Sequence, residues 1–164
     1  MARTIDSVQF SLGRDTARAH PMHVASRPAT LEDLSFLVSL RLRTIDPHIR
    51  AAGTQLTLVE NEARARSNLE SCSIFVASGR PVGMMKVLRT PGLWNVDQFQ
   101  IEPDLQRQGI GAQLMRTLQQ EALQAKVRLT LSVLKGNPAL RLYERLGFKI
   151  VSETESIYAM ESAA

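Results

Sequence analysis

Residues 106–111 read QRQGIG, and AQLM follows them directly. The stretch WNVDQFQI precedes them at 94–101 and has the apolar and aromatic character of a strand, which Pro103 closes. Glycines at 109 and 111 let the backbone approach an anion with no Cβ in the way. A helix that begins there offers that anion unpaired N–H groups and about half a positive charge. The stretch predicts a phosphate-binding turn, with a plain strand-to-helix turn as the alternative.

Two well-known phosphate motifs do not fit QRQGIG. The dinucleotide fingerprint G-x-G-x-x-G needs a third glycine where Leu114 stands. A P-loop needs a Gly-Lys pair followed by Ser or Thr, and the chain contains none. Gln106 and Gln108 add side-chain donors and Arg107 adds charge, which suits a pyrophosphate. These residues alone leave open whose pyrophosphate it is.

The rest of the chain alternates between strand and helix patterns. From 127 to 134, apolar and polar residues alternate with the period of two that is typical of a strand. We expect Asn137 to cap the next helix, Pro138 to take its first position and Gly147 to end it. The expected strands are 8–12, 23–27, 73–77, 82–89, 94–101 and 127–134, followed by a hairpin around 153–155. The expected helices are 31–43, 57–71, 112–125 and 138–146. We expect residues 44–56 to form a loop.

This order of elements predicts an α/β fold with a mixed sheet. The chain has 164 residues, of which 44% are hydrophobic and 22% charged, as in an ordinary globular domain with one sizeable core. We find no internal repeat, low-complexity tract or linker. We therefore expect a single domain at 23–164, preceded by an N-terminal extension at 1–22.

Composition argues against membrane and nucleic-acid partners. No apolar run approaches the length of a membrane span, and residues 1–22 lack the continuous apolar core of a secretory signal, so we expect a cytoplasmic protein. The net charge of +4 would be compatible with nucleic acid, but the arginines are scattered and aromatic residues make up only 5%. The charge indicates a mildly basic surface with a modest attraction for anionic ligands.

Cys72 is the single cysteine, so no internal disulfide forms within one chain. A zinc site would need mostly His and Asp or Glu ligands, and we expect no metal. A catalytic thiol would need a histidine beside it in space, whereas the three histidines all lie early in the chain, beside breaks in the pattern. We interpret Cys72 as a buried, unreactive thiol.

Two blocks of sequence resemble one known family. The first is the spacing Ile101-x-Pro103-x-x-Gln106-x-x-Gly109-x-Gly111, which resembles the acetyl-CoA signature of the GNAT superfamily of N-acetyltransferases. The second, NPALRLYERLGF at 137–148, looks like the family's N-x-x-A-x-x-L-Y-x-x-x-G-F block, with Leu140 where small residues are often seen. The resemblance covers roughly Pro28 to Met160 and is specific only in the second half. It implies a mixed, mostly antiparallel central sheet flanked by helices.

The resemblance also implies acetyl-CoA as the acyl donor. Carried over by position, the backbone of Phe99 and Ile101 would bind the pantetheine arm, and Asn137 and Tyr143 would flank the thioester. The implied pyrophosphate site is the backbone of Gln106, Arg107, Gln108, Gly109, Ile110, Gly111 and Ala112. Capping its helix already explains Asn137, so a cap alone and a cap that also binds ligand stay open.

Tyr143 would then be the general acid for the departing thiolate, because a phenol of pKa about 10 can donate a proton. A core tyrosine is the alternative. Asp97 would take the proton of the attacking amine, directly or through a water. Strict alternation places Asp97 on one sheet face with Phe99 and Ile101, whereas a bulge would bring Gln98 inward instead. A backbone N–H near Phe99 would meet the oxyanion.

The acceptor is an amine whose identity the sequence does not fix. We expect substrate choice to lie with 44–56, which holds Asp46, His48 and Arg50, and with the final hairpin. A small amine, an amino acid and a protein N-terminus all fit. The alternative function is an acyl-CoA-binding sensor of the same fold without turnover. Assembly is not readable, and a homodimer is one of the open states.

Overall fold

The computed structural model describes residues 8–9 and 22–162. Their strands form one sheet in the order β1-β2-β3-β4-β5-β6-β8-β7, in which β5 and β6 are the parallel pair and the other neighbours are antiparallel. The strands are β1 (Val8–Gln9), β2 (His23–Pro28), β3 (Cys72–Ala77), β4 (Arg80–Thr90), β5 (Leu93–Ile101), β6 (Arg128–Leu134), β7 (Phe148–Glu153) and β8 (Ile157–Ser162). This mixed, mostly antiparallel sheet confirms the expected fold class.

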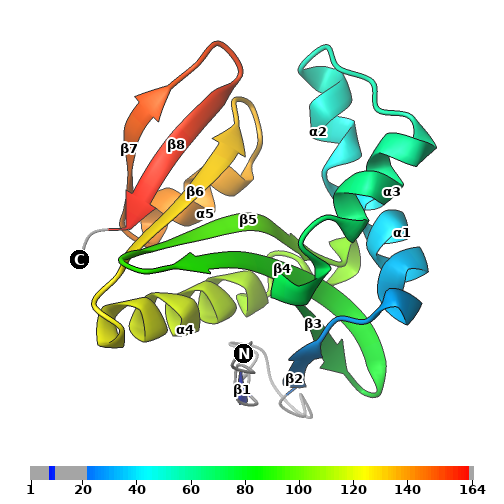
Figure 1. Cartoon of the computed structure of the whole chain (residues 1–164), viewed down its shortest axis with the longest axis horizontal. Helices are drawn as coiled ribbons and strands as arrows, with labels where there is room; N and C mark the ends of the chain where they lie inside the picture. The colour runs from blue at the N-terminus through cyan, green and yellow to red at the C-terminus, as the bar shows by residue number, and fades with distance from the viewer. Residues whose placement is uncertain (1–7, 10–21, 163–164) are drawn as a thin grey trace, which may run out of the picture.

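The helices are α1 (Leu34–Thr44), α2 (Asp46–Ala51), α3 (Leu58–Arg66), α4 (Ile110–Gln124) and α5 (Ala139–Arg145), with single 3-10 turns at Leu31–Asp33, Leu69–Ser71 and Pro103–Leu105. Figure 1 shows α4 running beneath the sheet, and α1, α2 and α3 gathered at the other side of it. The sheet is therefore covered on both faces, which is why β4 is buried almost continuously along its middle.

Alternate residues of the central strands supply two cores. Ile74 and Met84 belong to a cluster beneath α1 and α3, whereas their neighbours Phe75 and Met85 belong to the larger cluster beneath α4 and α5. Lys86 is buried on the α3 side and donates to the backbone carbonyls of Arg64, Ala65 and Ser67. It thereby satisfies the carbonyl groups at the end of α3.

Several expected boundaries follow from their capping residues. Asp33 accepts a hydrogen bond from the Thr30 backbone N–H at 2.8 Å, as expected for the first helical segment. Thr57 and Glu60 form a capping box at the start of α3. Asn137 Oδ1 accepts from Ala139 N at 2.9 Å, so Asn137 does cap α5. Gly147, in the left-handed region at φ +85°, follows this helix.

The predicted loop at 44–56 is wrong in part, because it contains α2. Pro47 lies in the first turn of α2, where its missing N–H costs no hydrogen bond. Asp46 and Arg50 then pair one turn apart at 2.6 Å. The predicted helix at 57–71 is shorter than expected and ends at Arg66, since Asn68 turns into the left-handed region.

The remaining strand and helix predictions are confirmed within a few residues, including the final hairpin of β7 and β8. The expected strand at 8–12 is described only over Val8–Gln9, which pairs with β2, and residues 10–12 lie outside the described residues. None of the described helices is long and apolar enough to cross a membrane.

Candidate active site

A cleft opens where β5 and β6 part. The two strands pair only from Leu93 to Val96 and from Arg128 to Leu131, and beyond these residues they diverge. The cleft has a volume of about 440 Å³ and lies between the free ends of the two strands. Its lining comes from α1 and the segment after it (Arg41, Ile45, Ile49, Ala52, Thr54, Leu56), from α3 (Arg64), from β5 (96–100), from β6 (131–134) and from Asn137, Ala139, Tyr143, Ser156 and Ile157.

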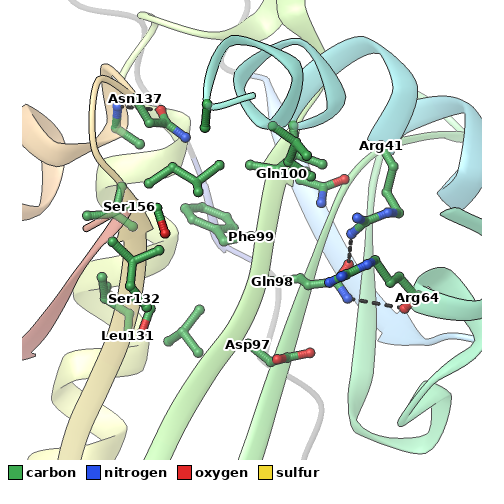
Figure 2. A pocket seen from close by; sticks show the side chains of 18 of the residues that line it. Arg41, Arg64, Asp97, Gln98, Phe99, Gln100, Leu131, Ser132, Asn137 and Ser156 are labelled. Carbon is green, nitrogen blue, oxygen red and sulfur yellow. Dashed lines mark hydrogen bonds between the residues drawn. The ribbon is translucent and has the colours of Figure 1, made fainter. Parts of the chain in front are cut away.

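A β-bulge in β5 decides which side chains enter this cleft. Lys86 of β4 pairs with Gln98, and the next residue, Val87, pairs with Val96, so Asp97 has no partner on β4. Figure 2 shows Asp97 and Gln98 on the side of β5 that faces α1 and α3, whereas the ring of Phe99 points toward β6. The expectation that Asp97 shares a face with Phe99 and Ile101 is therefore wrong, and the alternative with a bulge is confirmed.

The bulge places Gln98 in a polar network on the α3 side of the cleft. Its Oε1 accepts from Arg41 Nη1 at 2.9 Å, and its Nε2 donates to the Arg64 carbonyl at 3.2 Å. Arg41 Nε donates to Asn61 Oδ1 at 3.3 Å, and burial lowers the pKa of the Arg41 guanidinium. Asp97 is exposed and lines the same cleft. The network fixes the floor of the cleft beside Asp97.

Tyr143 lines the cleft from α5 and is 7% exposed. Its ring packs against Phe148 in the core beneath α4 and α5. Burial raises the pKa of its phenol to about 12. Asn137 lines the cleft too, so it is both a helix cap and a wall residue.

The QRQGIG stretch forms a turn before α4. Gly109 precedes the helix with φ +84°, and a Cβ built on it would meet no atom within 4 Å. The first helical backbone hydrogen bond runs from Gln113 N to Gly109 O at 3.1 Å. The N–H groups of Ile110, Gly111 and Ala112 precede it and have no acceptor within the helix. This is the anion-binding geometry of a helix N-terminus.

The sequence suggests the side chains of Gln106 and Gln108 as donors to a phosphate, but both donate to backbone carbonyl groups of the protein. Gln106 Nε2 donates to Ile101 O at 2.9 Å, and Gln108 Nε2 donates to Asp104 O at 2.8 Å. Both amides therefore hold the turn in shape rather than stand free for a ligand. Arg107 is exposed, with its backbone in the left-handed region at φ +61°. Backbone N–H groups and the Arg107 charge remain as the features of this turn that could bind an anion.

Ile101 and Ile110 are buried in the core against α4, so a ligand could contact them only through their backbone groups, and the Ile101 carbonyl already accepts from Gln106. A Cβ on Gly111 would touch the Phe99 ring at 3.6 Å and Leu142 at 3.7 Å, which is ordinary contact. Gly111 therefore faces the packed side of α4. Of the two glycines, Gly109 is the one that the turn itself requires.

The structure also places Cys72, Asp46 and the two segments expected to choose the substrate. Cys72 is 1% exposed, and burial raises the pKa of its thiol to about 11, which agrees with an unreactive thiol. Asp46 is buried against Arg50 and Asn61 rather than free for a substrate. The segment after α1 and the final hairpin do border the cleft, through Ile49 and Ser156 among others.

Sequence reasoning missed Arg41, Arg64 and Gln100 as cleft residues. One signal for Arg41 was present, because it continues the apolar stripe of Leu34 and Leu37 on α1. A charged side chain at a core-facing position needs buried hydrogen-bond partners. An arginine within an apolar stripe therefore indicates a buried polar site. Nothing in the local sequence distinguishes Arg64 from the other exposed arginines.

The family model of the acetyltransferase (GNAT) domain matches residues 48–157 of the chain. The chain belongs to the GNAT acetyltransferase family. The match spans the strands that part, the turn before α4 and the helix that carries Tyr143. It confirms the resemblance inferred from the QRQGIG and NPALRLYERLGF blocks. No curated protein matches this GNAT chain by sequence.

Solved structures share the GNAT fold at low sequence identity. The PaiA N-acetyltransferase from Thermoplasma acidophilum, in complex with coenzyme A, is 14% identical with a TM-score of 0.69, over 86% of this chain and 99% of that chain. The ribosomal-protein-S18-alanine N-acetyltransferase from Escherichia coli is 19% identical with a TM-score of 0.64, over 86% and 96%. Arabidopsis thaliana Naa50, in complex with the bisubstrate analogue CoA-Ac-MVNAL, is 14% identical with a TM-score of 0.65, over 86% and 99%.

Proposed function

We propose that this protein transfers an acetyl group from acetyl-CoA to a primary amine. The observation that carries the proposal is the divergence of β5 and β6, which opens a cleft lined by Tyr143 and Phe99, and Phe99 in turn lies beside Gly111 in the first turn of α4. Coenzyme A has a pyrophosphate at one end and a thiol at the other. A pyrophosphate bound at the N-terminus of α4 would leave the thiol end of coenzyme A to reach the cleft past Phe99.

The divergence also supports a role for the β5 backbone. Beyond Val96 the edge of β5 that faces β6 pairs with no other described strand, so N–H and C=O groups along it are available for hydrogen bonds, apart from the Ile101 carbonyl that accepts from Gln106. The amides of a pantetheine arm can pair with such an edge as an added strand would. Phe99 and Ile101 are the residues whose backbone would hold the arm. Residues 106–112 would hold the pyrophosphate through their N–H groups.

The amine would attack the thioester carbonyl directly. A lysine-like amine has a pKa of about 10.4 and is mostly protonated at neutral pH, so a base must remove its proton. Asp97 is the carboxylate of the β5 wall, and it would act directly or through a water. A backbone N–H near Phe99 would stabilise the oxyanion.

Tyr143 would protonate or hydrogen-bond the departing thiolate. An ordinary thiol has a pKa of about 8.5, below the value of about 12 that burial gives Tyr143. Complete proton transfer is therefore uphill unless the thiolate is desolvated as well, which burial in the same cleft would achieve. The phenol stays protonated at neutral pH and is always present as a donor.

A test of acetyl transfer is thiol release from acetyl-CoA over a library of primary amines, with calorimetry of coenzyme A binding alongside. Release with at least one amine, and an acetylated product by mass spectrometry, is the expected result. Binding of coenzyme A without release for any amine would favour the sensor. Absence of both would remove the proposal.

A further inference from the structure

Two arginines meet on one side of the cleft. Arg41 is 4% exposed and donates to two amide oxygens, those of Asn61 and Gln98. Arg64 is exposed and lines the cleft beside it. In the described part of the chain neither arginine forms an ion pair. A buried guanidinium without a carboxylate in direct contact is costly, and an anionic ligand in the cleft would offset that cost.

Asp46 and Asp97 both favour the charge of Arg41, but neither forms an ion pair with it in the described residues. Asp46 is buried and already pairs with Arg50 at 2.6 Å. Asp97 lies on the bulge of β5, on the same side of the strand as the two arginines (Figure 2). Because Asp46 already pairs with Arg50, the carboxylate that lines the cleft beside the two arginines is Asp97.

Gln100 supplies a third polar group. It is 7% exposed, lines the cleft, and its Oε1 accepts no hydrogen bond from the described residues. Buried amide oxygens are almost always paired. An amide with an unsatisfied side can turn about its last bond and present either its oxygen or its NH₂ group to a substrate. Apolar side chains of Ile45 and Ile49 line the cleft as well.

We propose that the acceptor is a primary amine that also carries a carboxylate, which Arg64 binds with Arg41 behind it, while the amine lies against Asp97 and Gln100. This assignment rests on the acetyl transfer proposed above. Arginine suits a carboxylate because its planar fork donates two parallel hydrogen bonds. The same two charges repel a second ammonium, so linear diamines are poor acceptors. Free amino acids and peptides with an acidic residue near the N-terminus both present this chemistry.

Matched acceptors test the proposal. Thiol release is measured with glycine and β-alanine, with their carboxamides, with putrescine, and with a tripeptide whose second residue is aspartate. We expect kcat/KM to be higher for the carboxylates than for their amides and for putrescine. A preference for the free acids identifies an amino acid as the source of the carboxylate, and a preference for the tripeptide identifies a peptide N-terminus. Equal rates for acids and amides would overturn the proposal.

Arg64→Gln is the diagnostic variant, because Arg64 is exposed and its loss leaves the core intact. We expect KM for the preferred carboxylate to rise roughly tenfold to a hundredfold, with kcat and the KM of the amide little changed. Arg64→Lys should restore part of the loss. Arg66→Gln is the matched control, since Arg66 is an exposed neighbour on α3 that does not line the cleft. An equal effect of both variants would overturn the assignment.

Calorimetry separates failure of this inference from failure of acetyl transfer. Glycine, β-alanine and the tripeptide are titrated into protein saturated with coenzyme A, for the wild type and for Arg64→Gln. Arg64-dependent binding without turnover would keep the carboxylate site and remove acetyl transfer. Turnover of amines without Arg64-dependent binding would keep acetyl transfer and overturn the carboxylate site. Weaker binding of coenzyme A itself to Arg64→Gln would assign Arg64 to the donor and overturn the proposal.

Discussion

The rings of Tyr143 and Phe148 meet edge to face, with centroids 5.8 Å apart and an angle of 65° between their planes. This contact holds the Tyr143 ring through its carbon atoms, and Tyr143 also lines the cleft. The ring and the hydroxyl therefore have separable roles. The ring stabilises the core beneath α5, and the hydroxyl is the proposed donor to the departing thiolate.

Tyr143→Phe keeps the ring contact and removes only the hydroxyl. We expect kcat to fall by about 10²-fold or more while the affinity for acetyl-CoA and the melting temperature change little. Steady-state thiol release and calorimetry measure the two effects. Tyr158→Phe is the control, because Tyr158 is the other tyrosine of the chain and does not line the cleft. Unchanged turnover in Tyr143→Phe would remove Tyr143 as the acid.

Gly109→Val should abolish binding of coenzyme A. The substitution places a side chain at φ +84°, in the open space before the N–H groups of α4, and costs roughly 1–3 kcal/mol of backbone strain. Gly92→Val is the matched control, since Gly92 has φ +78° and equally open surroundings in the turn between β4 and β5. It should cost similar stability and keep coenzyme A affinity by calorimetry. Tight binding to Gly109→Val would contradict the phosphate assignment.

Asp97→Asn should lower kcat/KM by about 10²-fold near neutral pH, because the amide cannot accept the proton of the amine. The deficit should shrink as pH rises toward the pKa of the acceptor, where more of the amine is already deprotonated. A pH–rate profile of both proteins measures this. Glu62→Gln, at an exposed site on α3 outside the cleft, serves as control. A deficit that stays constant with pH would indicate a positioning role instead.

Cys72 should make stability fall at alkaline pH. Burial raises the pKa of its thiol from the ordinary value of 9.0 to about 11 in the folded protein, so the folded state holds the proton more tightly. The resulting stability is complete below pH 9 and is lost as pH rises toward 11, by at most about 3 kcal/mol. Urea unfolding of the wild type and Cys72→Ala across this range isolates the effect. A stability difference that is independent of pH would contradict the raised pKa.

Local sequence was sufficient to predict most helices and strands and the turn before α4. The caps Thr57 and Asn137 and the alternation of β6 act within a few residues, so the segments they define are readable from the chain. The turn of Gly109 is equally local. Helix α2 escaped prediction because its proline and following glycine resemble a loop, whereas the Asp46–Arg50 pair and the contact with Asn61 stabilise it.

The sequence by itself determined the order of strands and helices, the GNAT blocks and the turn that ends at α4. Only the tertiary structure decided which side chains share the cleft. Arg41 meets Asn61 and Gln98, which lie 20 and 57 residues away, and the bulge at Asp97 exists only against its partner strand β4. Hydrogen bonds within a turn depend on neighbouring residues, whereas strand register and a buried charge depend on the packing of distant segments.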